Sequence, residues 1–192
     1  MMMSIQEHNE RNARTKKMLL WFAMISMFMM FAGLTSAYVV SASRPDWLNT
    51  LVLPVAFKLS TAVIVMSSVT FHLVKVATKK GNRNAATTWL LITLVLGVTF
   101  VFFQFQGFKQ FTEMGYFLTG AGSNPTTSFI YITTVVHVAH LLAGLIVLLV
   151  VIYNHFKQKY NPSQTLGIEL GAMFWHFLDI LWVYLFLFFY FY

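Results

Sequence analysis

Two long apolar stretches of this chain carry ionisable side chains that could do chemistry. His137 and His140 stand three residues apart in one stretch, and Glu169, His176 and Asp179 lie in the other. Residues three or four apart occupy one face of a helix, so each set would point in a single direction. Histidines and carboxylates arranged in this way could ligate a metal or haem, or could bond to one another as a structural network inside a membrane.

The composition indicates a membrane protein. Of 192 residues, 58% are apolar, 17% are aromatic and only 10% are charged, whereas about a quarter of the residues in soluble domains are charged. The net charge of +7 comes from basic residues in short segments between apolar runs, so it indicates membrane topology rather than nucleic-acid binding. The absence of cysteine excludes disulfides, iron–sulfur clusters and thiolate-bound copper, but leaves histidine sites for haem or zinc open.

Five stretches are long enough to cross a bilayer core of about 30 Å as helices, which takes roughly 20 apolar residues. None shows the alternation of a membrane β-strand. The sequence therefore predicts an all-α, polytopic membrane domain (18–192) behind a short N-terminal segment (1–17). The predicted spans are 18–40, 51–77, 85–108, 128–153 and 169–192.

Basic residues predict the orientation of these spans. They cluster before the first span, between the second and third, and between the fourth and fifth, which is one side of the membrane. Cytoplasmic loops carry the excess of Lys and Arg, so we expect the N-terminus in the cytoplasm and the C-terminus outside. The third connection, 109–127, contains four of the turn-forming Gly and Pro residues and should fold as a turn-rich loop.

The polar residues of the last two spans must face protein. Asp179 lies about 15 Å into the fifth span, and an ionised group at that depth costs about 2.5 to 3.5 kcal/mol. We expect a buried network in which Glu169, His176 and Asp179 meet His137 and His140. A metal or haem site built from the same histidines is the alternative.

Four segments resemble subunit III of the haem-copper terminal oxidases. A Glu followed by a Trp-His-Phe-x-Asp-x-x-Trp run is similar to the last helix of that family, and the His-x-x-His-x-x-x-Gly segment is similar to its penultimate helix. The first and third spans resemble the family less specifically. The segments are 169–182, 137–144, 96–104 and 26–33.

The resemblance implies a five-helix form of this subunit, which would hold no redox centre or metal of its own. It implies binding to the catalytic subunit I, which carries the haems and copper, together with subunit II and further respiratory subunits. The implied work is to stabilise that assembly, hold structural phospholipid and protect its proton-uptake side, in a bacterial-type plasma membrane. The motifs also supply residues expected to pack helices together: Gly33, Gly97, Gly144, Trp175 and Trp182.

Two positions depart from the family pattern. Many members have Glu where this chain has Met27 and Gly107, so a role that rests on those carboxylates is not expected here. A small transporter, or a haem cytochrome using His72 with the three other span histidines, remains the alternative function.

Overall fold

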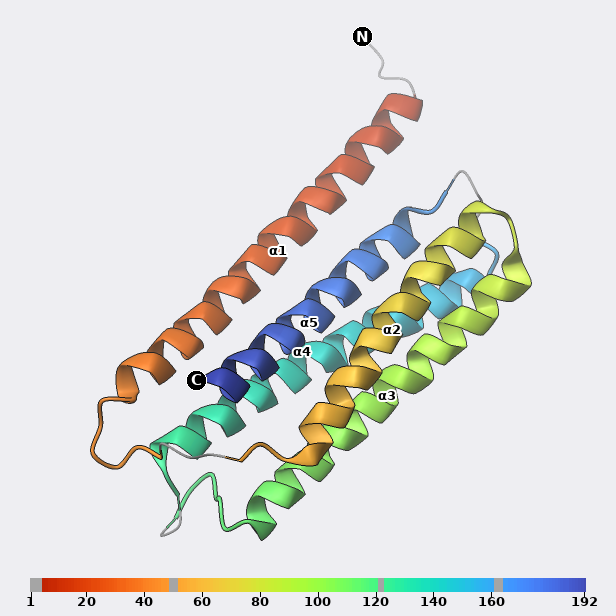
Figure 1. The fold of residues 1–192 in the computed structure, drawn as a ribbon. Coiled ribbons are helices and arrows are strands. Elements are labelled where there is room, and N and C mark those ends of the chain that lie inside the picture. The colour runs from red at the N-terminus through yellow and green to blue at the C-terminus, as the bar shows by residue number, and fades with distance from the viewer. Residues whose placement is uncertain (1–4, 49–51, 121–122, 161–163) are drawn as a thin grey trace.

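The computed structural model describes residues 5–48, 52–120, 123–160 and 164–192. Within these ranges the chain forms five helices that are long and apolar enough to cross a membrane, and no extended strand (Figure 1). The predicted all-α, five-span fold class is confirmed. The helices are α1 (Ile5–Ser41), α2 (Val55–Lys79), α3 (Arg83–Glu113), α4 (Pro125–Phe156) and α5 (Leu166–Phe191).

Four of the helices form a closed ring, and the first helix lies outside it. α2 contacts α3 and α5, and α4 contacts the same two helices, whereas the described part of α1 packs on α4 and α5 alone. Figure 1 shows α1 set apart on one side of the bundle, next to α5. Because α5 contacts α1, α2 and α4, its polar residues have several possible partner helices.

Helix boundaries differ most from the predicted spans at the starts of α1 and α2 and at the end of α3. α1 begins at Ile5 rather than at residue 18, because the polar segment before the apolar run is also helical. At 1.5 Å per residue, α1 is about 55 Å long and extends beyond a 30 Å bilayer core. α2 begins at Val55, directly after Pro54, because proline lacks a backbone N–H and is tolerated only at the start of a helix. Val52 and Leu53 are not helical, and the predicted start at Leu51 lies outside the described residues.

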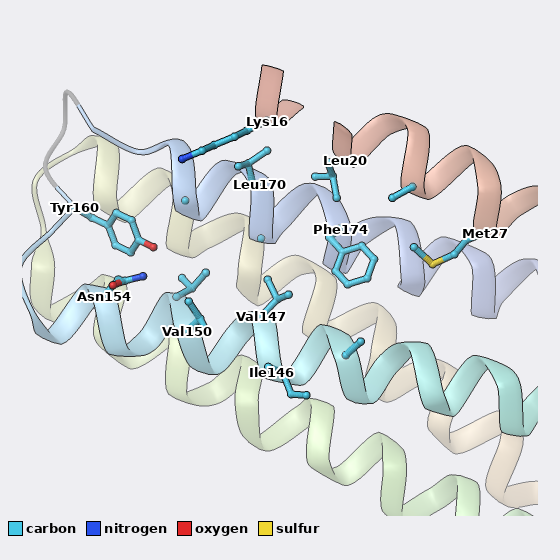
Figure 2. A pocket seen from close by; sticks show the side chains of 15 residues that line it. Lys16, Leu20, Met27, Ile146, Val147, Val150, Asn154, Tyr160, Leu170 and Phe174 are labelled. Atoms are coloured by element: carbon cyan, nitrogen blue, oxygen red, sulfur yellow. The ribbon is translucent and has the colours of Figure 1, made fainter. Parts of the chain in front are cut away.

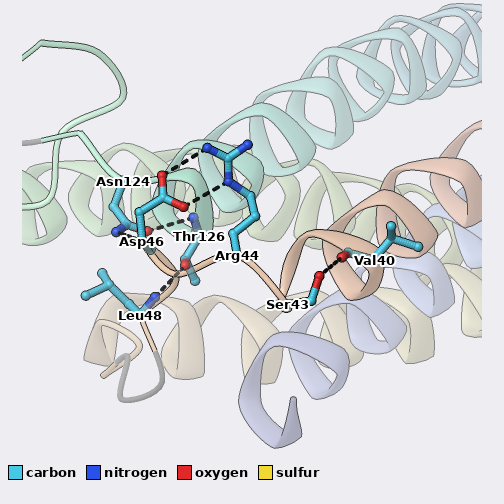
Figure 3. A network of polar contacts seen from close by, with 7 residues as sticks. All are labelled: Val40, Ser43, Arg44, Asp46, Leu48, Asn124 and Thr126. Atoms are coloured by element: carbon cyan, nitrogen blue, oxygen red, sulfur yellow. Dashed lines mark hydrogen bonds and ion pairs between the residues drawn. The ribbon is translucent and has the colours of Figure 1, made fainter.

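The segment after α1 is fastened to the start of α4 (Figure 3). Arg44 Nε donates to Asp46 Oδ1 over 2.9 Å, and the Leu48 amide donates to Thr126 Oγ1 over 3.0 Å. The side chain of Asn124 donates to the Asp46 carbonyl and caps α4 by accepting from the Thr126 amide. The Arg44 guanidinium lowers the pKa of the exposed Asp46 carboxyl, mainly through their hydrogen bond.

The connection between α3 and α4 is shorter than predicted, because α3 continues to Glu113. Gly115 and Gly120 have φ angles of 82° and 100°, in the left-handed region that favours glycine. The hydroxyl of Tyr131, on α4, donates to the Tyr116 carbonyl over 3.1 Å and so holds the start of this loop against the bundle.

Candidate functional site

Two tryptophans fix the face of α5 that packs on α2. Trp175 and Trp182 are 1% and 2% exposed and stand seven residues apart, which is about two helical turns. Their indole nitrogens donate over 3.0 Å to Ser67 Oγ and Thr61 Oγ1. The hydroxyl groups of α2 therefore pair the indole donors of α5 inside the bundle.

Glycines allow close helix contacts at two of the three positions expected from the sequence. A Cβ on Gly97 would lie 2.8 Å from Trp175 Cη2, and a Cβ on Gly144 would lie 2.8 Å from Leu178 Cδ1. Gly33 differs from the expected packing role, since no atom lies within 4 Å of its Cβ position. The reason is that α1 lies outside the ring of the other four helices, and Gly33 faces outwards.

Two of the three histidines of α4, His137 and His140, lie among aromatic rings rather than carboxylates. His137 is fully buried, and its ring lies 5.1 Å from that of Trp182 and 6.0 Å from that of Phe100, between centroids. Neither of its ring nitrogens has a hydrogen-bond partner among the described residues. His140 is half-buried, and its Nδ1 lies 2.7 Å from the Val136 carbonyl one turn earlier in the same helix.

His176 and Asp179 point towards α2. His176 Nδ1 lies 2.6 Å from Ser68 Oγ, and its ring centroid lies 6.5 Å from that of His72. Asp179 is 3% exposed, and neither carboxyl oxygen makes a hydrogen bond among the described residues. Ser68 also interacts with the Asp179 carboxyl, without the geometry of a hydrogen bond.

Glu169 pairs with the first helix. Its Oε2 lies 2.9 Å from Lys17 Nζ, and its Oε1 accepts a 3.0 Å hydrogen bond from Thr165 Oγ1. Three residues of the expected network, Glu169, His176 and His140, therefore have separate partners, and no hydrogen bond in the described ranges joins the carboxylates of α5 to the histidines of α4. Spacing places three of these residues on one face of α5, where Glu169 pairs with Lys17 of α1 and His176 contacts Ser68 of α2.

Three of these contacts are with residues that sequence reasoning did not select as partners. Lys17 stands at the end of a basic run, which indicates membrane topology. Ser67 and Ser68 are hydroxyl residues of a kind typical of helix packing in general. Within the described ranges, no group of three or more His, Asp or Glu side chains is placed where it could hold a metal ion.

A largely apolar groove runs between α1, α4 and α5, with a volume of about 570 Å³. We call it the α1–α4–α5 groove. Figure 2 shows Lys16, Asn154 and Tyr160 at one end, and Phe174 and Met27 further along. Burial raises the pKa of the Tyr160 phenol, so this side chain stays neutral. The groove thus has a charged, polar end and an apolar body.

Comparison with known proteins identifies the family. The model of the family "Cytochrome c oxidase subunit III" matches residues 5–192, which include all five helices. The chain belongs to this family.

Curated relatives in the family come from several bacteria. The chain is 32% identical over 187 residues to the probable cytochrome c oxidase subunit 3 of Nocardia farcinica, covering 93% of this chain and 87% of the relative. It is 31% identical to the cytochrome c oxidase subunit 3 of Corynebacterium diphtheriae, covering 83% and 79%. It is 26% identical to the cytochrome bo(3) ubiquinol oxidase subunit 3 of Pseudomonas aeruginosa, covering 85% and 78%.

Family membership makes this chain a multi-pass membrane protein that serves as subunit III of a terminal oxidase. The resemblance inferred from the sequence motifs is confirmed. A membership of this kind implies partner oxidase subunits, and it favours the oxidase role over the transporter and haem cytochrome alternatives.

The surroundings of Met27 and Gly107, where many family members have Glu, suit the residues that this chain has there. Met27 lines the α1–α4–α5 groove, where a thioether suits apolar neighbours. At Gly107, a Cβ would clash with the ring of Phe57, which is 2% exposed. A glutamate at position 107 would therefore require Phe57 to leave its place in the core.

Proposed function

We propose that this chain is an accessory subunit without a redox centre of its own. It stabilises the catalytic subunit I, which carries the haems and copper, and protects the proton-uptake side of that subunit during turnover. The observation that carries the proposal is the family match along the whole described chain. The enclosure of His137 among aromatic rings supports it, because this histidine has no room beside it for a porphyrin.

The α1–α4–α5 groove fits a structural phospholipid. Lys16 supplies a cation, and Asn154 and Tyr160 supply hydrogen-bond donors, at the end where a headgroup would lie. The rest of the wall is aliphatic or aromatic, as the acyl chain of a lipid requires. We assign the headgroup to the Lys16 end and an acyl chain to the segment that reaches Met27.

Subunits I and II and further respiratory subunits are the proposed partners, in the plasma membrane of a bacterium. Curated relatives from three bacteria support this location. The basic residues at the N-terminal end of α1 and around the α2–α3 and α4–α5 connections support a cytoplasmic N-terminus and an external C-terminus.

Removal of the chain tests the accessory role. We expect the remaining oxidase to keep its haem and copper content and its initial rate of oxygen consumption, and to lose activity faster over successive turnovers. Loss of haem or copper in proportion to loss of the chain would contradict the absence of a redox centre here.

The lipid assignment is tested by Lys16→Ala in the intact oxidase, with Lys109→Ala as the matched control. Lys109 is a 71% exposed lysine at the other end of the bundle, on α3. Mass spectrometry of the purified complex should show fewer phospholipids per complex for Lys16→Ala alone. An equal phospholipid content in both variants would refute the assignment.

A further inference from the structure

A second groove separates α1 from α2. These two helices do not contact each other within the described ranges, and α5 forms the floor between them. The cavity has a volume of about 520 Å³. We call it the α1–α2 groove, and its wall includes Lys17, Trp21, His72, Lys75, His176 and Phe177.

Polar groups in this groove lie at bilayer depth. His72 is exposed and stands seven residues before the end of α2 at Lys79, which corresponds to about 10 Å. His176 is half-buried two turns into the helix from Glu169, with its ring 6.5 Å from that of His72. A polar side chain left facing hydrocarbon is unfavourable, so residues of this kind face protein or a water-filled cavity.

The charges in the groove favour an anionic occupant. Lys17 is paired with Glu169 over 2.9 Å, so these two charges largely cancel. Lys75 interacts electrostatically with both Glu169 and His176. Two positive charges, those of Lys17 and Lys75, therefore act on the single carboxylate of Glu169. The groove therefore has an excess of cationic and hydrogen-bond donor groups around His72.

The positions of these polar groups favour a protein helix over a lipid as the occupant of the α1–α2 groove. In the α1–α4–α5 groove the polar side chains lie at one end, as for a lipid headgroup. In the α1–α2 groove, His72 and His176 lie within the groove, beyond the pair formed by Lys17 and Glu169, where a lipid would place acyl chains. A protein helix can carry a carboxylate at that depth, and the apolar side chains of Trp21 and Phe177 can pack against the rest of it.

We propose that the α1–α2 groove receives one transmembrane helix of a partner subunit, with a carboxylate of that helix against His72 and Lys75. The proposal rests on membership of an oxidase complex. It names the surface and the chemistry through which this subunit binds its neighbour.

Photocrosslinking in the intact complex tests the occupant. p-Benzoylphenylalanine is placed at Phe177, in the groove, or at Phe105, a 62% exposed residue of α3 that does not line the groove. We expect the Phe177 probe to crosslink to a transmembrane peptide of an oxidase subunit that contains Asp or Glu, and the Phe105 probe not to crosslink to that peptide. Crosslinking at Phe177 only to phospholipid, or to no protein, in a complex that still holds its haem and copper subunits would overturn the proposal. Absence of those subunits would instead refute membership of the oxidase.

Substitution tests the polar contact separately. His72→Leu should lower the fraction of the chain retained on the purified oxidase about tenfold, the loss expected for one charge-assisted hydrogen bond. The control is Val69→Leu, at a 57% exposed position one turn earlier on α2. Both variants should reach the membrane in equal amounts, because leucine is compatible with a lipid-facing surface. Retention of His72→Leu equal to that of Val69→Leu would also overturn the proposal.

Discussion

Substitution of Gly97 by alanine probes a close helix contact of the core. The new Cβ would lie 2.8 Å from Trp175 Cη2 and 3.0 Å from Leu145 Cδ2. Trp175 cannot easily move away, because it is 1% exposed and its indole nitrogen is bonded to Ser67. Overpacking of this kind costs about 1 to 3 kcal/mol, so we expect Gly97→Ala to destabilise the bundle.

Gly33→Ala is the matched control for this change. It makes the same substitution in a helix, but no atom lies within 4 Å of the new Cβ. Alanine gains up to about 1 kcal/mol of helix propensity over glycine at both sites, and this gain cancels in the comparison. The difference in free energy of unfolding between the two variants therefore isolates the overpacking, which we expect to be about 1 to 3 kcal/mol.

Reversible unfolding of the purified chain in mixed micelles, titrated with a denaturing detergent, measures this difference. A double variant supplies the decisive check: Trp175→Phe removes the ring atoms that the new Cβ would meet, so Gly97→Ala should cost less in that background. Equal stability of Gly97→Ala and Gly33→Ala, or an unchanged cost in the Trp175→Phe background, would show that this contact does not limit the packing.

Three further predictions concern other contacts. Trp182→Phe should cost about 0.6 kcal/mol in the same unfolding assay, the average for a hydrogen bond between membrane helices, and a cost near zero would refute the role of its threonine partner. Gly107→Ala should destabilise by about 1 to 3 kcal/mol, because Phe57 is held in the core, and a neutral effect would contradict that fixation. The lowered pKa of Asp46 means that its ion pair stabilises segment 42–48 above about pH 4 and loses this effect as the pH falls through the lowered value. After division by the intrinsic exchange rate at each pH, the protection of this segment against hydrogen exchange should therefore fall only when the pH drops below about 4, whereas Asp46→Asn should show low protection both above and below that pH.

The sequence predicted the helices well because their signals are local. An apolar run of about 20 residues has only one stable form in a bilayer, and five such runs became five helices. Boundaries differed where a local rule was overlooked, as at Pro54, or where a polar segment extended the helix, as at Ile5.

The partners of the polar residues could not be predicted from the sequence in the same way. Helical spacing correctly places Glu169, His176 and Asp179 on one face of α5, but it does not say which helix that face meets. The packing of α5 among three neighbours turned this face to Lys17 and Ser68. The helix that this face meets depends on the packing of the whole bundle. That packing includes the contacts of the α5 tryptophans with α2.

Purification of the tagged chain from its native membrane, without chemical crosslinking, is the most direct measurement of the central claim. We predict that it is recovered with stoichiometric partner subunits that contain haem and copper, that the preparation consumes oxygen, and that the haem and copper remain with the partners when the subunits are separated. Recovery of this chain as a homo-oligomer without haem- and copper-containing partners would contradict its assignment as a terminal oxidase subunit.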